Sequence, residues 1–362
     1  MHILLVITGL GMGGAERQVC DLADQFSKSG HSVLLISLTG EVINRPQSNN
    51  VEVVNIEMKK TPVGFTKAYC RVRQLIKAFA PDVVHSHMVH ANLFARFLRL
   101  TVSMRKLICT AHNTNEGGWV RMLAYRISDS LCDISTNVSQ EAVDAFISHK
   151  AVPANRMLPM HNGIDTDRFL FDSSMRKKLR KKLNLTDYDS LILAVGRLNA
   201  QKDYPNLLTA FSLIVSVNPE IQLAVIGVGE EKSVLTSMVD DLGLNKHVHF
   251  LGLQHNVNEW LSAADVFVLS SAWEGFGLVV AEAMACKRVV VATDCGGVKE
   301  VLGDCGFLVP PQNSQALADG LSAALSLTSD EARVKGELAR QRVIEHYSLQ
   351  EQAKRWLELY QR

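Results

Sequence analysis

The sequence has 362 residues, enough for about two domains. Its 38 basic and 37 acidic residues leave a formal net charge of +1, so we expect no broad cationic face and no nucleic-acid partner bound through phosphates alone. Hydrophobic residues make up 47% of the chain and charged residues 21%, the balance of an ordinary globular protein.

Apolar runs alternate with helix-like segments along the first half of the chain. We predict strands at 2–8, 31–38, 82–85 and 106–110, and helices at 15–26 and 66–79. Near-continuous apolar strands separated by helices are typical of parallel sheets that are covered on both faces. No run of 18 apolar residues occurs, and the first strand lacks the basic start and cleavage site of a secretion signal.

The alternation starts again at residue 191. We predict strands at 191–196, 222–227, 248–252, 266–270 and 289–292, and a last helix from Ser348 that carries Ala353, Trp356, Leu357 and Tyr360 on one stripe. Open parallel sheets bind ligands beyond the carboxyl ends of their strands. We therefore expect two sheets that face each other across one ligand-binding cleft.

Two compositional features bear on partners and on the cellular compartment. Six of the seven residues in 176–182 are basic, which fits either a solvated helix face or a contact with an anionic membrane. The seven cysteines are an odd number without a CxxC pair, which favours reduced thiols in a cytosolic protein over a disulfide framework or a zinc site.

A glycine-rich loop, 9–14, lies between the first strand and the first helix. Its glycines allow backbone N–H groups to approach a phosphate at the start of the helix. Gly9, Gly11 and Gly14 also fit the dinucleotide pattern GxGxxG, but Ser37 and Leu38 stand where that pattern needs an acidic residue. A ligand-proximal loop, a nicotinamide site and a simple turn are the three interpretations.

Two further groups of residues at strand ends suit a phosphorylated sugar. Arg197 and Lys202, at the end of one predicted strand, could bracket a diphosphate, although each alone could be a solvated surface charge. After a later strand, Glu274 precedes a glycine turn and a helix that contains Glu282. The amides of the first helical turn would attract an anion, while the carboxylates would bind sugar hydroxyls; a capped helix with solvated acids is the alternative.

The histidines fall into two groups. His85, His87 and His90 form an HxH pattern that could ligate a metal, but the additional ligands that such a site needs are missing. His112 follows the strand at 106–110 and is expected to point into the cleft, or to be a structural histidine.

The order of these motifs resembles the large family of retaining, nucleotide-sugar-dependent glycosyltransferases numbered four. The motifs are Gly13-Gly14, then Arg197 with Lys202, then Glu274-Gly275-Phe276-Gly277 leading to Glu282. The segments 162–165, 282–285, 294–300 and 306–311 match that family as well. One departure is Lys287-Arg288, where the family commonly has glycine-proline.

The resemblance implies an α/β fold of the GT-B type, with two Rossmann-like domains. The acceptor domain would span 1–165 and the donor domain 166–345, with a last helix at about 346–362 packing back on the first domain. The segment at 162–165 would be the hinge.

The resemblance also implies roles for individual residues. Arg197 and Lys202 would hold the donor diphosphate, Glu282 the ribose and Glu274 the transferred sugar. His112 would contact that sugar near the reacting carbon. Gly14, Gly277, Leu278 and Val279 would contact the donor phosphate. Gly229 and Leu251 would line the pocket for the base.

From this family we expect a hexosyl- or N-acetylhexosaminyltransferase that uses a nucleotide sugar, with UDP favoured, and no cofactor or metal. The expected acceptor is a glycan, for example a polyprenyl-diphosphate-linked oligosaccharide of bacterial O-antigen, capsule or exopolysaccharide synthesis. We expect peripheral contact with the inner membrane. The alternatives are a nucleotide-sugar epimerase of the same fold and an NAD-dependent oxidoreductase.

Overall fold

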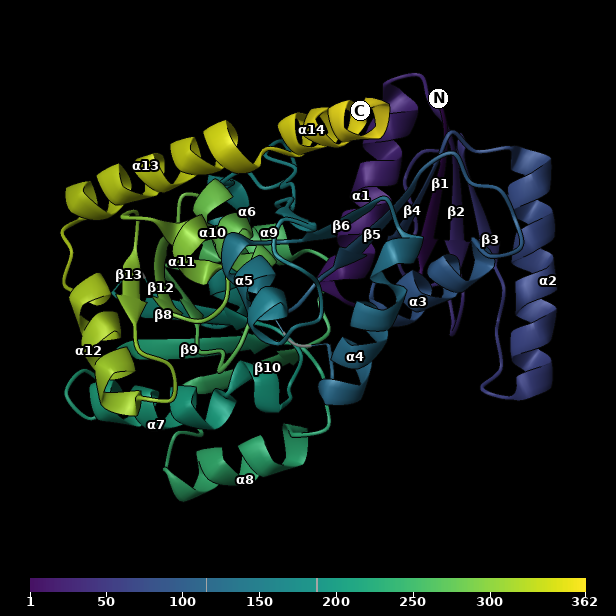
Figure 1. Ribbon diagram of the computed structural model, residues 1–362. Helices are drawn as coiled ribbons and strands as arrows, with labels where there is room; N and C mark the ends of the chain where they lie inside the picture. Colours follow the sequence, from purple (N-terminus) through teal and green to yellow (C-terminus); the bar gives the residue numbers. More distant parts are fainter. Residues whose placement is uncertain (115, 187) are drawn as a thin grey trace. The chain divides into compact units, whose positions relative to one another are not determined.

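The computed structural model describes residues 1–114, 116–186 and 188–362. The chain forms two compact units, one made of Met1–Gly163 and Leu349–Arg362 and the other of Ile164–Ser348 (Figure 1). We call them unit 1 and unit 2 and describe each by itself. The chain leaves unit 1 after Gly163 and returns to it after Ser348.

Unit 1 is built on a parallel sheet that, within the described residues, has seven strands in the order β3-β2-β1-β4-β5-β6-β7. The strands are β1 (His2–Ile7), β2 (Ser32–Ser37), β3 (Val51–Asn55), β4 (Val83–His87), β5 (Leu107–Ala111), β6 (Ile134–Asn137) and β7 (Met157–Pro159). The strand order reverses between β1 and β4, and in open sheets of this kind ligands bind beside the carboxyl ends at that reversal.

The helices of unit 1 cover both faces of its sheet (Figure 1). They are α1 (Gly14–Lys28), α2 (Pro62–Phe79), α3 (Val89–Leu98), α4 (Trp119–Ser128), α5 (Gln140–Ser148) and α14 (Leu349–Gln361), with a short 3-10 turn at Asp129–Leu131. The last helix, α14, packs Trp356 and Tyr360 into the same apolar core as α1, β1 and β2. Tyr360 lies 5.5 Å, between ring centroids, from Phe26 of α1.

Unit 2 has a second parallel sheet, of six strands over its described residues, in the order β10-β9-β8-β11-β12-β13. The strands are β8 (Ser190–Val195), β9 (Ile221–Ile226), β10 (Val248–Gly252), β11 (Val266–Leu269), β12 (Val289–Thr293) and β13 (Phe307–Val309). Its order reverses between β8 and β11, which puts the loops that follow these two strands at the reversal.

The helices of unit 2 lie on the two sides of this sheet (Figure 1). They are α6 (Ser173–Lys182), α7 (Tyr204–Val215), α8 (Lys232–Asp241), α9 (Val257–Ala263), α10 (Leu278–Ala285), α11 (Val298–Leu302), α12 (Ser314–Leu325) and α13 (Ser329–Tyr347), with a 3-10 turn at Ala200–Lys202. In the described part of the chain, no helix is both long and apolar enough to cross a bilayer.

The predicted alternation of strands and helices is confirmed, with boundaries shifted by a few residues. Four strands were not predicted: β6, both edge strands of the unit 1 sheet, β3 and β7, and one edge strand of the unit 2 sheet, β13. Edge strands such as Val51–Asn55 are only partly buried, so their residues lack the continuous apolar run that marked the central strands.

Candidate active site

Lys202 and Glu274 form an ion pair at the carboxyl end of the unit 2 sheet. The Nζ atom of Lys202 donates to Oε1 of Glu274, and the Ser271 hydroxyl donates to the same oxygen over 2.7 Å. The two paired side chains are only 17% and 9% exposed. A cation and a carboxylate are therefore held together in a sheltered position, with the hydroxyl of Ser271 orienting the carboxylate.

Three glycines allow the loops after β8 and β9 to touch. A Cβ atom on Gly227 would lie 1.9 Å from the carbonyl oxygen of Gly196, and one on Gly229 would lie 2.1 Å from that of Leu198. Gly196 itself packs against the Lys202 side chain, where a Cβ atom would meet Cε at 2.9 Å. These close approaches place Gly229 beside the Arg197–Lys202 loop.

The second predicted cation, Arg197, lies on the same loop. Its side chain is exposed and, among the described residues, forms no ion pair, whereas Lys202 is paired with Glu274. The N–H of the following residue, Leu198, donates to the Val228 carbonyl over 3.0 Å, which fixes the backbone of the loop. The guanidinium is therefore free to bind an anion at the mouth of the site.

Helix α10 begins beside this loop with a turn that needs glycine. Gly277 is its N-cap, has φ +80°, and supplies no side chain to the first-turn amides. The amides of Leu278 and Val279 have no hydrogen-bond partner among the described residues, so they carry the partial positive charge of a helix N-terminus. Glu282, one turn further, is buried with 7% exposure.

The loop before α10 rests on the Gly296-Gly297 segment. A Cβ atom on Gly296, which has φ +58°, would lie 2.0 Å from the carbonyl oxygen of Glu274. The N–H of Gly297 donates to the Gly275 carbonyl over 3.1 Å. The glycine pair thus holds the backbone on both sides of Glu274 in place.

The structure brings together most of the residues that the sequence analysis assigned to the donor. They surround the ends of β8, β9, β11 and the start of α10, and Leu251 lies at the end of the neighbouring strand β10, where the Gly227 N–H donates to the Gly252 carbonyl over 2.9 Å. Their assignment to donor groups stays a prediction, because no ligand tests it.

Unit 1 has a pair of histidines at the ends of adjacent strands. Nδ1 of His87, at the end of β4, lies 3.2 Å from Nε2 of His112, just after β5. The other ring nitrogen of each is buried and has no partner among the described residues. Burial lowers the pKa of His112 to about 4 and holds the pKa of His87 well below its ordinary value. His112 is therefore neutral near pH 7 and can act as a hydrogen-bonding group.

Glu116 supports the loop that follows His112. Its carboxylate accepts the His112 N–H over 2.9 Å and the Tyr125 hydroxyl over 3.1 Å. Burial raises the pKa of Glu116, while these hydrogen bonds oppose the shift. The loop is thereby tied to helix α4 and keeps His112 in place.

The glycine-rich loop ends at Gly14, the first residue of α1. Gly13 is the N-cap of α1 and has no side chain to cap the first amides. The Glu16 carboxylate comes so close to Gly13 that a Cβ atom there would lie 2.2 Å from Oε2 of Glu16. The carboxylate of Glu16 therefore lies over the start of the helix. Any phosphate that binds at Gly14 has to displace this side chain or share the site with it.

The HxH pattern does not form a metal site. His85 is fully buried and uses both ring nitrogens, one with the Tyr360 hydroxyl at 2.6 Å and the other with Oγ1 of Thr110 at 2.6 Å. Over the residues that the structure describes, no group of three or more His, Cys, Asp or Glu side chains has metal-binding geometry.

The basic segment 176–182 lies on α6 and is partly structural. Arg176 and Arg180 both bind the carboxylate of Asp265, and the Arg180 side chain is only 7% exposed. The four lysines of the segment, Lys177, Lys178, Lys181 and Lys182, are exposed. Two of its six cations therefore hold α6 onto unit 2.

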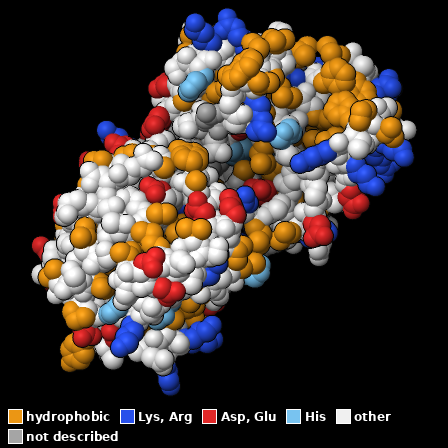
Figure 2. All heavy atoms as spheres, turned by 90° about the horizontal axis from the view of Figure 1, so that it is seen from below, with side chains coloured by type: hydrophobic (Ala, Val, Ile, Leu, Met, Phe, Trp, Pro, Cys, Tyr) orange, Lys and Arg blue, Asp and Glu red, His pale blue; other side chains and the backbone are white. Residues whose placement is uncertain are grey.

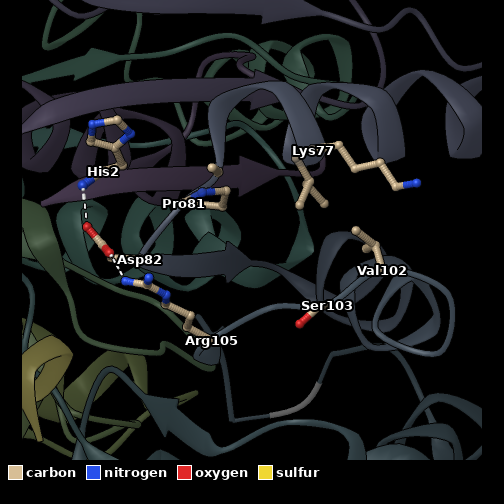
Figure 3. Close-up of a pocket in the computed structure, with 9 residues that line it drawn as sticks. His2, Lys77, Pro81, Asp82, Val102, Ser103 and Arg105 are labelled. Carbon is tan, nitrogen blue, oxygen red and sulfur yellow. Dashed lines mark hydrogen bonds and ion pairs between the residues drawn. The ribbon is translucent and has the colours of Figure 1, made fainter.

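A cavity of about 460 Å³ lies at the opposite, amino-terminal edge of the unit 1 sheet (Figure 3). Its acid, Asp82, accepts the backbone N–H of His2 over 2.9 Å and pairs with Arg105 at 2.7 Å (Figure 3). None of the predicted site residues lines it. Its one acid is already paired, and the cavity lies away from the carboxyl ends of the strands, so we do not assign it to the active site.

Three residues of this arrangement were not predicted from the sequence: Ser271, Asn199, and His87 as the partner of His112. The side-chain oxygen of Asn199, on the Arg197–Lys202 loop, is buried and has no partner among the described residues. Asn199 could have been found from the sequence, because it is a polar residue between Arg197 and Lys202 at the end of a predicted strand. Nothing in the sequence pointed to the other two.

Two family models match the chain. Residues 12–168 match Glycosyltransferase Family 4, and residues 175–342 match Glycosyl transferases group 1. The curated N-acetyl-alpha-D-glucosaminyl L-malate synthase of Bacillus anthracis is 28% identical over 354 residues, which cover 93% of this chain and 90% of that protein.

Two other similar proteins have names that mention a ligand or an acceptor. The N-acetylgalactosamine-N,N'-diacetylbacillosaminyl-diphospho-undecaprenol 4-alpha-N-acetylgalactosaminyltransferase of Campylobacter jejuni is 24% identical, covering 89% of each chain. The crystal structure of HepE from Anabaena in complex with UDP has a TM-score of 0.85 at 22% identity, covering 99% of both chains. The solved structure and the two parallel sheets establish a two-domain α/β fold of the GT-B type.

Proposed function

Because this chain belongs to the family 4 glycosyltransferases, we propose that it transfers a sugar, with retention of configuration, from a nucleotide sugar to a glycan acceptor carried on a polyprenyl diphosphate. A UDP-sugar is the favoured donor, and a hexose or N-acetylhexosamine the favoured sugar. The UDP in the similar Anabaena structure supports the donor, and the diphospho-undecaprenol in the name of the Campylobacter relative supports the acceptor. We place the reaction at the cytoplasmic face of the inner membrane.

The observation that carries this proposal is the cation pair beside the start of α10. Lys202 is held by Glu274, Arg197 is exposed on the same loop, and the amides of Leu278 and Val279 have no partner among the described residues. A departing nucleoside diphosphate gains negative charge, and fixed cations and amides that stabilise such charge accelerate its departure. These groups would supply that stabilisation without a metal ion.

The carboxylates suit the sugar groups of the donor. In our proposal Glu282 binds the ribose hydroxyls, with Gly229 and Leu251 beside the base, and Glu274 binds the transferred sugar. Hydrogen bonds to charged groups contribute about 1.5–3 kcal/mol each, enough to orient both sugars. Gly14 and the neutral His112 would complete the contacts from unit 1.

The proposed step is a front-face displacement. The bond between the anomeric carbon and the diphosphate oxygen breaks, and the acceptor oxygen bonds to the same face of that carbon. The acceptor proton passes to the departing phosphate oxygen. Arg197 and Lys202 stabilise the diphosphate that leaves, and no covalent intermediate forms on the protein.

Calorimetric titration with UDP-, GDP- and ADP-sugars tests the donor assignment. We expect binding of at least one UDP-sugar, and the absence of binding to any nucleotide sugar would contradict the proposal. NMR of the bound donor incubated with the enzyme alone tests the alternative of an epimerase, which would convert the donor without an acceptor. NMR of the product with acceptor shows whether the anomeric configuration is retained.

A further inference from the structure

The chain as a whole has a net charge near zero, but one segment of unit 1 is strongly basic. Residues 58–128 contain 12 Lys and Arg residues but only two acidic ones, Asp82 and Glu116. Asp82 is paired with Arg105, and Glu116 accepts hydrogen bonds from His112 and Tyr125. Eight of the basic side chains are exposed: Lys59, Lys60, Lys67, Arg71, Lys77, Arg105, Arg121 and Arg126. The charge of unit 1 is therefore unevenly distributed along the chain.

Helix α4 of this segment turns apolar side chains to the outside. Its inner face is formed by Met122 and Tyr125, which are buried. On the opposite face lie Trp119, Val120, Leu123 and Ile127, which are 76%, 60%, 43% and 73% exposed. Arg121 and Arg126 flank this stripe and are exposed as well. A solvent-facing apolar stripe between arginines is typical of helices that lie in a membrane interface.

Helices α2 and α3 carry further exposed apolar side chains. On α2 and α3, Phe65 and Phe97 lie 6.1 Å apart between ring centroids and are 38% and 48% exposed. Leu100, directly after α3, is 59% exposed. At the other end of α4, Arg126 donates to the carbonyl of Lys150 over 3.2 Å, which brings that lysine beside the helix. Figure 2 shows a broad hydrophobic area with Lys and Arg at its border on unit 1.

We propose that this surface, formed by α4 with the exposed residues of α2 and α3, docks unit 1 onto an anionic lipid bilayer. Its apolar stripe would enter the headgroup region, and its cations would bind lipid phosphates, each contributing about 1 kcal/mol near the surface. The stripe begins seven residues after His112, and Glu116 ties the His112 backbone to Tyr125 of α4, so the docked protein would hold His112 next to the lipid. This part of the argument rests on the proposed lipid-linked acceptor.

Charge and shape favour a bilayer over other occupants. A second copy of the chain would bring two strongly basic surfaces together, which is repulsive. Nucleic acid would be bound by the cations but would leave Val120, Leu123 and Ile127 without a role, since single strands stack on aromatic rings. The basic helix α6 lacks this combination, because its two apolar residues, Met175 and Leu179, are half-buried and buried. Membrane contact is therefore assigned to α4 rather than to the segment 176–182.

Vesicle binding by the full chain tests the proposal. We expect cosedimentation with vesicles of phosphatidylcholine and phosphatidylglycerol at 7:3, weaker binding to phosphatidylcholine alone, and weaker binding at high salt. The double variant Trp119→Ser/Ile127→Ser should lower the partition coefficient by about tenfold or more. The matched control is Val217→Ser, which changes an exposed apolar residue of unit 2, 86% exposed, and should bind as the unaltered protein does.

Tryptophan fluorescence gives a second readout that depends on position. Trp260 and Trp356 are buried, and Trp273 is the other exposed tryptophan besides Trp119. In a Trp273→Phe background, anionic vesicles should shift the emission of Trp119 to shorter wavelength. Circular dichroism verifies that each variant is folded.

Several outcomes would overturn the proposal: no binding to anionic vesicles, equal binding by Trp119→Ser/Ile127→Ser, or binding only to RNA or to a second copy. Failure of the proposed function looks different. In that case the vesicles still bind, but no nucleotide sugar is bound and no lipid-borne acceptor is used. If both proposals hold, the double variant keeps its turnover of a short water-soluble acceptor and loses turnover of the vesicle-borne one.

Discussion

Lys202 donates to the buried carboxylate of Glu274, a residue 72 positions further along the chain. The pair joins the loop after β8 to the loop that precedes α10, two segments that meet where the strand order of unit 2 reverses. The ion pair holds both side chains in a sheltered position. The cation that we assign to the leaving group is thus in position before any ligand binds.

Replacement of Lys202 by Met should remove one preorganised stabilising group from the reaction. We expect kcat to fall by about 10²–10³-fold, because loss of one such group costs about 2.7–4 kcal/mol in the transition state. The measurement is steady-state turnover of the donor with a glycan acceptor. Lys178→Met, which changes an exposed lysine of α6, is the control and should keep normal turnover. Equal turnover in both variants would remove Lys202 from the site.

Replacement of Glu282 by Gln should weaken donor binding while the helix stays folded. Glu282 is buried in α10, and the neutral amide keeps its size but loses the charge-assisted hydrogen bonds that we assign to the ribose. We expect the dissociation constant for the nucleotide sugar to rise by about tenfold or more, equivalent to about 1.5–3 kcal/mol. Calorimetry measures this change, and an unaltered affinity would contradict the assignment.

The histidine pair predicts how stability depends on pH. Burial lowers the pKa of His112 to about 4 and that of His87 well below 6.5, whereas in the unfolded chain both take up a proton near pH 6.5. Below pH 6.5 the unfolded state therefore binds more protons, so the free energy of unfolding falls as the pH drops towards 4. Each histidine contributes at most about 1.4 kcal/mol per pH unit, and this destabilisation is absent above pH 6.5.

Urea denaturation between pH 7 and pH 4.5 tests this dependence on the histidines. His112→Gln should show a shallower loss of stability with falling pH, since glutamine does not titrate. His149→Gln, which replaces an exposed histidine at the end of α5, is the matched control and should keep the slope of the unaltered protein. Identical slopes in all three proteins would show that His112 is not held neutral by the fold.

Replacement of Arg180 by Ala should destabilise unit 2. Arg180 donates to Asp265 over 3.0 Å and to the carbonyl of Thr186 over 3.0 Å, and its removal leaves both without this partner. We expect a loss of about 2–3 kcal/mol, less than for a fully buried pair because Asp265 is 31% exposed. Lys181→Ala, one residue further on the exposed face of α6, should change the stability by about 0.5 kcal/mol or less. Comparable losses in the two variants would contradict the structural role of Arg180.

Most interior strands of both sheets were predictable because burial on both faces requires apolar runs. The interior strand β6 was not, because its buried residues, Ser135, Thr136 and Asn137, are polar. Glycines were equally informative at two places, since Gly277 has positive φ and Gly296 approaches the backbone of Glu274. Burial on both faces and positive φ each restrict the residue types at a position, so the local sequence indicates them directly. A short edge strand such as β7 at Met157–Pro159 does not restrict its residues in this way, and it forms only because a neighbouring strand is there to pair with it.

The contacts that orient the site residues could not be predicted, because they join distant parts of the chain. His87 meets His112 only because β4 and β5 are neighbours in the sheet. Both side chains of the departure at Lys287-Arg288 make tertiary contacts, that of Lys287 being an ion pair with Glu337 at 2.6 Å. Lys287 has φ +59°, a conformation that favours glycine, and the Arg288 guanidinium donates to the Ala264 carbonyl over 2.7 Å and stacks over Phe171 at 4.7 Å.

The return of the chain to unit 1 at Leu349 has a consequence for how this protein can be divided. A protease cut or a gene break near Gly163 would yield an amino-terminal fragment without α14, whose Trp356 and Tyr360 belong to its own apolar core. Such a fragment would expose that core and leave His85 without the Tyr360 hydroxyl. The first 163 residues are therefore not a complete domain that can be exchanged alone. A chimera that exchanges only these residues would combine the new sheet with the original α14. We expect folded chimeras only when Met1–Gly163 and Leu349–Arg362 are replaced together.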